Sequence, residues 1–284
     1  MVKKEKLKKP IRLMIFIIGF ALCCYPLLSG IIGRYNQQNL ISTYANELEH
    51  QDETKIKEAL KSAEKYNSML YQTMGATVGN SSSILSEDNY KKMLDLTGTG
   101  IMGSIEIPKI GVNLPIYHGT SDEVLSKGVG HVLDSSFPVG GKSTRSVLTG
   151  HRGLPTAKLF TRLDELEKDD YFFIKTCDQI LAYQVNKIEE IKPEDVEKLS
   201  IEADKDQVSL ITCTPYGLNT HRLVVTGERV EYNEKQKQEI KSEMPSLREL
   251  AFTILPFVFL AVFIYMILKE RKEIRSKNEN KKED

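Results

Sequence analysis

Two long apolar runs lie near the ends of the chain, and each predicts a membrane-spanning helix. Residues 13–33 and 250–268 contain no charged side chain, and about 20 apolar residues are enough to cross a bilayer as a helix. A cleaved signal peptide is the alternative for the first run, because its basic start and apolar centre fit one too. We favour an uncleaved helix, because the run is long and no small-residue cleavage site follows it.

The charges at the two ends predict how the chain is oriented. Residues 1–12 carry six basic side chains and one acidic one, and residues 269–284 carry seven and five. The positive-inside rule then places both of these tails in the cytoplasm and residues 34–249 outside the cell membrane. Because the whole chain is neutral, its central part has a net charge of −7. An acidic centre argues against nucleic acid as a partner.

The segment that follows the first apolar run has a helical pattern. Over residues 34–97, apolar side chains recur at steps of three and four, with a break at 50–54. The stripe is clearest in the second helix, at Ile56, Ala59, Leu60, Ala63, Tyr66, Met69 and Leu70. We expect these two helices, which together cover residues 35–74, to pack against the domain that follows them. Residues 75–89 are rich in glycine, serine and asparagine and predict a loop, followed by a short helical turn over 90–96.

From residue 98 onward the pattern changes to short alternating runs separated by glycine and proline. The predicted strands are 101–107, 112–117, 146–149, 171–176, 180–191, 208–212 and 223–230. Seven or eight such strands predict a mainly β fold, a closed antiparallel or mixed barrel over residues 98–233. Short helices are expected at 120–127, capped by Thr120 or Ser121, and at 156–163. Residues 234–249 then form a linker to the second apolar run.

Residues 208–222 hold the first candidate chemistry. A buried strand ends at Cys213, a turn with Pro215 and Gly217 follows, and Arg222 begins the next strand. A thiol at a strand end can serve as a nucleophile, but a small buried hydrophobe is the alternative. A disulfide between Cys177 and Cys213 is possible but not needed in a domain of this size. The chain has no Cys-x-x-Cys pair, so neither a zinc ribbon nor a thioredoxin motif is supported.

His151 is the best candidate for a proton partner of the thiol. It follows a strand and has Gly150 and Gly153 beside it, which let the backbone come close to another group. The other histidines, His50, His118, His131 and His221, have structural or solvated alternatives. Together Cys213, His151 and Arg222 supply a nucleophile, an acid/base and an oxyanion donor, although their separation in sequence does not place them together.

Longer strings around these residues resemble one family. The segment Ser209-Leu-Ile-Thr-Cys213 is similar to the Thr-Leu-x-Thr-Cys signature of sortases, the cysteine transpeptidases of Gram-positive surfaces. Four further strings also fit this family: Leu148-Thr-Gly-His151-Arg-Gly-Leu-Pro155, Cys213-Thr-Pro-Tyr-Gly-Leu-Asn-Thr-His-Arg222, Gly103-Ser-Ile-Glu-Ile-Pro-Lys-Ile-Gly111 and Leu114-Pro-Ile-Tyr-His-Gly-Thr-Ser121. With the second apolar run, they resemble the pilus-building class C sortases, and the resemblance covers residues 98–230.

The resemblance implies an eight-stranded sortase barrel and a reaction. Cys213 would attack the Thr–Gly bond of an LPxTG-like sorting signal, and a lysine amine of the next pilin would resolve the thioacyl-enzyme. His151 would be the general acid/base and Arg222 the oxyanion or substrate-positioning group, with no metal or organic cofactor. Substrate contacts are expected from Thr212, Ser209, Leu148 and Tyr216.

Two departures from the family pattern are visible. Ser209 stands where the signature usually has threonine, which keeps the hydroxyl. Class C enzymes usually carry a lid with an Asp-Pro-aromatic anchor, yet no proline occurs between Pro26 and Pro108. We therefore expect an open or atypically covered site, with residues 75–95 as an unusual lid region. The alternatives are a housekeeping sortase that uses a peptidoglycan precursor as acceptor, and a membrane-tethered binding barrel without activity.

Overall fold

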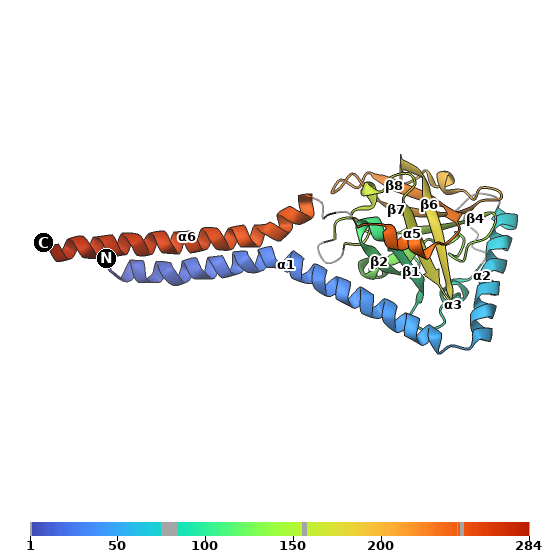
Figure 1. The fold of residues 1–284 in the computed structure, drawn as a ribbon, viewed down its shortest axis with the longest axis horizontal. Helices are drawn as coiled ribbons and strands as arrows, with labels where there is room; N and C mark the ends of the chain where they lie inside the picture. Colours follow the sequence, from blue (N-terminus) through green and yellow to red (C-terminus); the bar gives the residue numbers. More distant parts are fainter. Residues whose placement is uncertain (1, 75–84, 155–157, 243, 245–246, 284) are drawn as a thin grey trace. The chain divides into compact units, whose positions relative to one another are not determined.

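The computed structural model describes residues 2–74, 85–154, 158–242, 244 and 247–283, and it separates into two units. One unit contains residues 1–31 and 244–284, and the other contains residues 32–243. Helix α1 (Val2–Glu49) contributes to both units, and helix α6 (Leu247–Glu283) belongs to the first (Figure 1). The predicted lid residues 75–84 and the start of the turn expected at 156–163 lie outside the described residues.

The first unit is a pair of helices that contain both predicted apolar runs. Within α1 and α6, the stretches Ile11–Glu49 and Thr253–Glu273 are long and apolar enough to cross a membrane. The ring of Phe16 stacks on that of Phe263 with centroids 3.6 Å apart, and Arg12 forms an ion pair with Glu270. Gly19 faces the ring of Phe259, which a side chain at this position would crowd.

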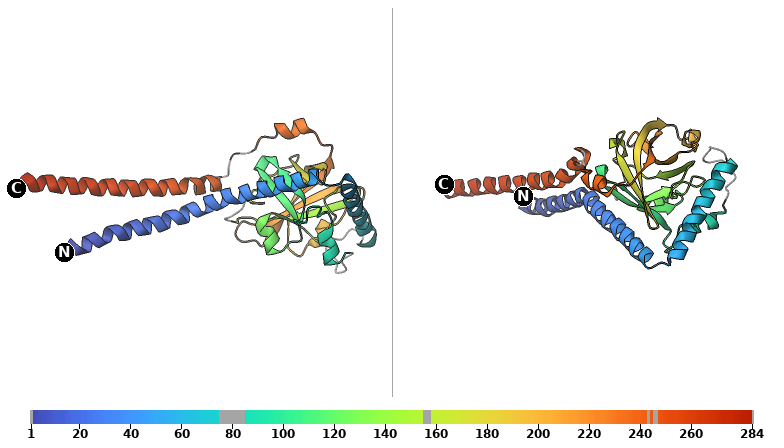
Figure 2. Two further views of the ribbon diagram at one scale, coloured as in Figure 1. Left: turned by 90° about the horizontal axis from the view of Figure 1, so that it is seen from below. Right: turned by 45° about the vertical axis from the view of Figure 1, so that its right-hand side comes forward.

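The second unit begins with a helical arm that packs on a barrel. Helix α1 ends at Glu49 and α2 (Glu53–Met74) begins after a short turn, so the predicted break between two helices is confirmed. Five side chains of the predicted stripe are buried in the main core: Ile56, Leu60, Ala63, Tyr66 and Leu70. Asn67 ties α2 to the barrel, because its amide exchanges two hydrogen bonds with the backbone of Phe137 at 2.7 and 3.0 Å. Both views in Figure 2 show α2 beside the barrel.

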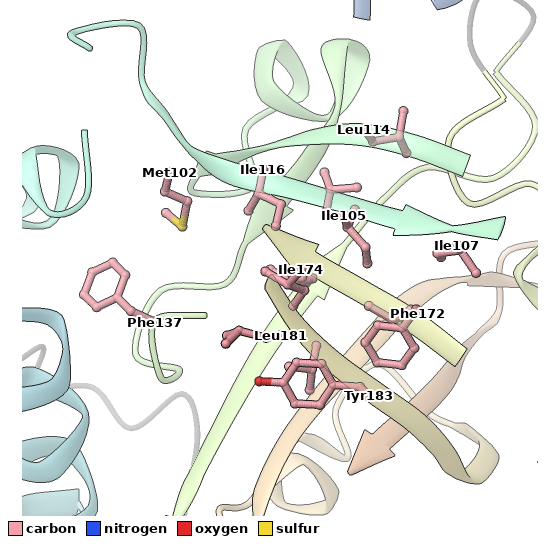
Figure 3. Packing of buried hydrophobic residues seen from close by; sticks show 14 of the residues in the cluster. Met102, Ile105, Ile107, Leu114, Ile116, Phe137, Phe172, Ile174, Leu181 and Tyr183 are labelled. Carbon is pink, nitrogen blue, oxygen red and sulfur yellow. The ribbon is translucent and has the colours of Figure 1, made fainter. Parts of the chain in front are cut away.

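Eight strands close the barrel, as the resemblance implied. They are β1 (Ile101–Ile107), β2 (Val112–His118), β3 (Val129–His131), β4 (Thr144–Thr149), β5 (Tyr171–Thr176), β6 (Gln179–Ile191), β7 (Asp206–Thr214) and β8 (His221–Val230). Their order around the barrel is β1-β2-β3-β4-β7-β8-β6-β5, and β4 runs parallel to β7. Figure 3 shows the interior, which is filled by branched and aromatic side chains such as Ile105, Ile116, Ile174 and Tyr183.

Short helices precede, connect and follow the strands. They are α3 (Glu87–Lys92), α4 (Asp122–Lys127), α5 (Glu234–Glu239) and the 3-10 turns η1 (Pro108–Ile110), η2 (Leu163–Glu165) and η3 (Val196–Leu199). Ser121 caps α4 by accepting a hydrogen bond from the Val124 amide, as one of the two predicted caps. The predicted linker after the barrel contains α5, because the Asn233 side chain accepts from two backbone amides and starts a helix there.

Candidate active site

Cys213 and Arg222 face each other across two neighbouring strands. In the antiparallel pair of β7 and β8, Cys213 is the direct register partner of Arg222. Residues directly opposite in such a pair project on the same face of the sheet. Both are partly exposed, so the thiol and the guanidinium lie at the same accessible end of the barrel.

Strand β4 brings His151 to the same end. It runs parallel to β7 with Thr149 level with Ile211. Beyond the strand end, the Gly150 amide still donates to the Ile211 carbonyl at 3.1 Å, and the Thr212 hydroxyl donates to the Gly150 carbonyl at 2.8 Å. Extending this register by two residues sets His151 level with Cys213.

The three groups continue an outward face of the barrel. A second apolar cluster lies on that face, separate from the barrel interior: Val147, Ile191, Leu199, Ile211 and Val224. Alternation along a strand places every second side chain on one face, so Cys213 follows Ile211 and Arg222 precedes Val224. Leu199 in η3 covers the cluster from the connection between β6 and β7. The candidate site therefore lies at the end of this outward face, next to the apolar cluster.

Glycine lets the loop that carries His151 pack closely. A side chain at Gly150 would lie 2.9 Å from the ring of Phe160. The Phe160 amide donates to the His151 carbonyl at 3.1 Å, which fixes the backbone of the candidate base. The glycine at this position therefore serves close packing.

Arg222 has donors that the fold does not use. Its Nη1 donates to the carbonyls of Asn219 and His221, both at 3.1 Å. Within the described chain these two are its only protein hydrogen bonds. A guanidinium carries five N–H groups and a permanent charge, so the others can meet an oxyanion or a peptide carbonyl.

The four residues expected to contact the substrate differ in their exposure to solvent. Tyr216 is 42 % exposed, so it can touch a ligand. Ser209, Leu148 and Thr212 are buried, with at most 1 % of their surface exposed. Because these three side chains are buried, we infer that they support the strands, and their contact with a peptide stays a prediction.

Ser209 belongs to a buried network that the sequence did not reveal. Its hydroxyl accepts a hydrogen bond from Arg145 Nε at 2.9 Å. The same guanidinium donates to the Thr226 hydroxyl and to the carbonyls of Lys198 and Ser200. Burial lowers the pKa of Arg145. Arg145 thus fastens the connection between β6 and β7 to the face that carries Cys213.

The other histidines have structural or solvated surroundings. His131 is fully buried between Tyr90, which lies 2.9 Å from its Nδ1, and the Ser136 carbonyl. Burial lowers the pKa of His131 to about 4. His118 contacts the carbonyls of Gly100 and Met93 through its two ring nitrogens. Both rings are fixed by local partners, and Nδ1 of His221 lies 3.0 Å from the Thr220 hydroxyl. His151 therefore remains the best candidate for the acid/base.

The described part of the predicted lid region packs on the barrel. Residues 85–95 contain α3, whose Tyr90 is buried and also accepts a hydrogen bond from the Gly119 amide at 2.9 Å. Leu94 is buried in the main core. Over residues 85–95, no hydrogen bond to Cys213 is present. This segment is therefore anchored on the barrel beside β3.

The two cysteines of the barrel unit should differ strongly in reactivity. Cys177 lies in the hairpin between β5 and β6, is 2 % exposed and forms no disulfide with Cys213. Burial raises the pKa of Cys177 to about 11, so only about one molecule in 1,000 is thiolate at pH 8.

We expect iodoacetamide to modify Cys213 about 100-fold faster than Cys177 at pH 8, because thiolate content and exposure govern the rate. Peptide mass spectrometry of the treated full chain measures both rates. Equal rates would contradict the structure at Cys177. The Cys177→Ala variant should retain the parent activity.

Comparisons with known proteins agree with this geometry. A family model described as the sortase domain matches residues 105–230. Sortase D of Bacillus subtilis (strain 168) is 34% identical over 131 residues, which is 45% of this chain. The chain spans 63% of the length of that relative and 52% of Sortase A of Streptococcus agalactiae.

Solved structures match a larger share of the chain than the family model does. The crystal structure of sortase C1 from Streptococcus agalactiae is 41% identical, with a TM-score of 0.64, and the match covers 69% of this chain and 100% of that one. Clostridium perfringens sortase C, solved with the C-terminal cell wall sorting motif, is 39% identical, with a TM-score of 0.60, and the match covers 68% of this chain and 99% of that one. Because the match covers the whole of that solved sortase C1 chain at this identity, the chain belongs to the sortase family of cysteine transpeptidases, in the class C group.

Proposed function

We propose that the chain is a membrane-anchored transpeptidase that joins pilin subunits. It cleaves an LPxTG-like sorting signal between threonine and glycine and transfers the acyl group to a lysine amine of another pilin. The observation that carries this proposal is the direct pairing of Cys213 with Arg222, with the strand that leads to His151 in register beside them.

The three groups supply each part of an acyl transfer. Cys213 attacks the threonine carbonyl as the thiolate, and Arg222 stabilises the oxyanion that forms. His151 gives its proton to the departing glycine amine as the C–N bond breaks, which leaves a thioester on Cys213. The same histidine then takes a proton from the incoming lysine amine, which attacks the thioester, forms the isopeptide bond and releases Cys213 as the thiolate.

The pilin acceptor is supported by the relatives. The Streptococcus pneumoniae sortase C structure, 38% identical over 68% of this chain, is described as giving insight into pilin substrate specificity. Its TM-score is 0.60 and the match covers 97% of that chain. Because the match covers nearly all of that solved chain, we extend a pilin acceptor to the present chain.

Two membrane spans would hold the enzyme at the outer surface. The apolar stretches of α1 and α6 have suitable length and composition. Basic clusters flank both stretches at the chain ends. By the positive-inside rule this arrangement puts both tails in the cytoplasm and the barrel outside, where sorting signals and acceptor amines meet.

Access to the thiol would not depend on an Asp-Pro-aromatic anchor. The sequence has no proline between Pro26 and Pro108. The described lid residues are held by Tyr90 at β3, and Cys213 is partly exposed. We propose that a sorting signal reaches Cys213 without first displacing an anchored side chain from residues 85–95.

The acceptor distinguishes the candidate functions. We expect the full chain in lipid nanodiscs to cleave an LPxTG peptide and to join it to a lysine of a purified pilin. Mass spectrometry of the products identifies the amine that is used. Transfer only to a peptidoglycan-like amine would support a housekeeping role, and binding of the peptide without cleavage would support a non-enzymatic barrel.

A further inference from the structure

Arg152 connects the loop of the candidate base to the strand of the candidate nucleophile. It directly follows His151, and its Nη1 donates to the hydroxyl of Thr214 at 3.3 Å. Thr214 in turn directly follows Cys213. The Thr214 hydroxyl also donates to Glu190 Oε1 at 3.4 Å, so it lies between a cation and a carboxylate. One side chain therefore joins the residues next to both reacting groups.

The same guanidinium makes two further contacts. Its Nη2 forms an ion pair with Asp164 in η2. Its central carbon lies 5.9 Å from the centre of the Tyr216 ring, within the range of a cation–π contact. Gly153 has a φ of +84°, and a Cβ there would lie 2.8 Å from the same ring. Tyr216, in the turn that follows Cys213, is therefore packed against the loop that carries His151.

Stability alone does not explain an arginine at this position. Its side chain is 5 % exposed, and its Nε is buried without a hydrogen-bond partner among the described residues. A buried donor without a partner costs stability. A buried ion pair is also often no more stable than apolar residues of similar size. Arg152 has both the unpaired donor and the buried ion pair, and it lies beside the candidate reacting groups. A role in function explains such a residue better than stability does.

We propose that Arg152 is a positioning residue that fixes the distance between His151 and Cys213. The inference rests on the proposed transpeptidase function. Arg152 acts through Thr214 and Tyr216 on one side and through the backbone of His151 on the other. A misplacement of about 1 Å at a reacting group can cost about 100-fold in rate. Lysine can replace Arg152 only in part, because a single ammonium lacks the planar fork that reaches Thr214 and Asp164 together.

The test uses Arg152→Met in the full chain in nanodiscs. We expect kcat for acyl-enzyme formation on an LPxTG peptide to fall about 30- to 100-fold, with KM within about twofold of the parent value. Arg152→Lys should recover only part of this loss. Thermal unfolding of each variant shows whether the fold is retained.

Lys109→Met is the matched control. Lys109 is a partly buried cation whose side chain is 12 % exposed and pairs with Asp170 and Glu167. It lies in η1 between β1 and β2, strands that carry none of the three candidate groups. We expect this variant to lose thermal stability and to keep kcat within about twofold, because its pairing supports packing alone.

Three results would overturn the inference or separate it from the proposed function. If the parent is active and Arg152→Met has the same kcat, the positioning role of Arg152 is overturned. A loss of kcat that follows the loss of thermal stability equally in both variants overturns it as well. If the parent forms no acyl-enzyme, the proposed function fails instead. In that case the pH profile of Cys213 alkylation decides, and an identical profile in Arg152→Met overturns the positioning role.

Discussion

Replacing Cys213 with alanine should lower kcat for cleavage of an LPxTG peptide about 10⁴- to 10⁶-fold, a loss typical of removing a catalytic nucleophile. The reason is chemical, because the methyl group of alanine cannot form the thioester that divides the reaction into two easier steps. The variant should form no acyl-enzyme at all, since this first step needs the thiol. Intact mass spectrometry after mixing with peptide should show the acyl adduct on the parent chain and none on the variant.

The control for this experiment is the second cysteine of the same unit. Cys177 is buried in the hairpin between β5 and β6, and Cys177→Ala should still form the adduct. Because Cys213 is partly exposed at a strand end, its replacement should leave thermal unfolding nearly unchanged. Peptide cleavage that continues at the parent rate in Cys213→Ala would exclude the proposed mechanism and leave the binding barrel as the better explanation.

Replacing His151 with alanine should lower kcat about 100- to 10,000-fold, the usual contribution of a general acid/base. Without the imidazole, neither the departing glycine amine nor the incoming lysine amine has a proton partner level with Cys213. The rates of acylation and of transfer to an added amine should therefore both fall. Rapid-mixing experiments with mass detection measure the two steps separately.

His50 provides the comparison. Its ring is exposed near the end of α1, where Nδ1 lies 2.7 Å from the carbonyl of Asn46. His50→Ala should keep kcat within about twofold of the parent value, because exposed substitutions away from a site have small effects. Equal losses in the two histidine variants would mean that the base has been assigned to the wrong residue.

The local features of this protein could be predicted from its sequence. Hydrophobic runs mark the two apolar helices, and spacing at three and four residues marks the stripe of α2 with its break before Glu53. Alternation and turn residues mark seven of the eight strands. Such signals depend on neighbours along the chain, which is why they survive without tertiary information. Strand β3 was missed because three residues, one of them glycine, are too few to show a period.

Part of the candidate site is also local. Cys213 and Arg222 lie on the two sides of one turn between β7 and β8, so the sequence keeps them close together. His151 is 62 residues away from Cys213, and its flanking glycines only suggested close packing. Its place beside the thiol depends on the parallel register of β4 and β7, which no local pattern encodes.

The sequence by itself thus determined seven of the eight strands, the long helices and the residue types able to carry out acyl transfer. Only the tertiary structure decided which side chains are accessible. It buries Ser209 against Arg145 and leaves Tyr216 exposed, although both flank Cys213 in sequence. It also brings Arg152 to Thr214. These outcomes depend on strand register and on which face of the sheet is covered, and both are set by contacts between residues far apart in the chain.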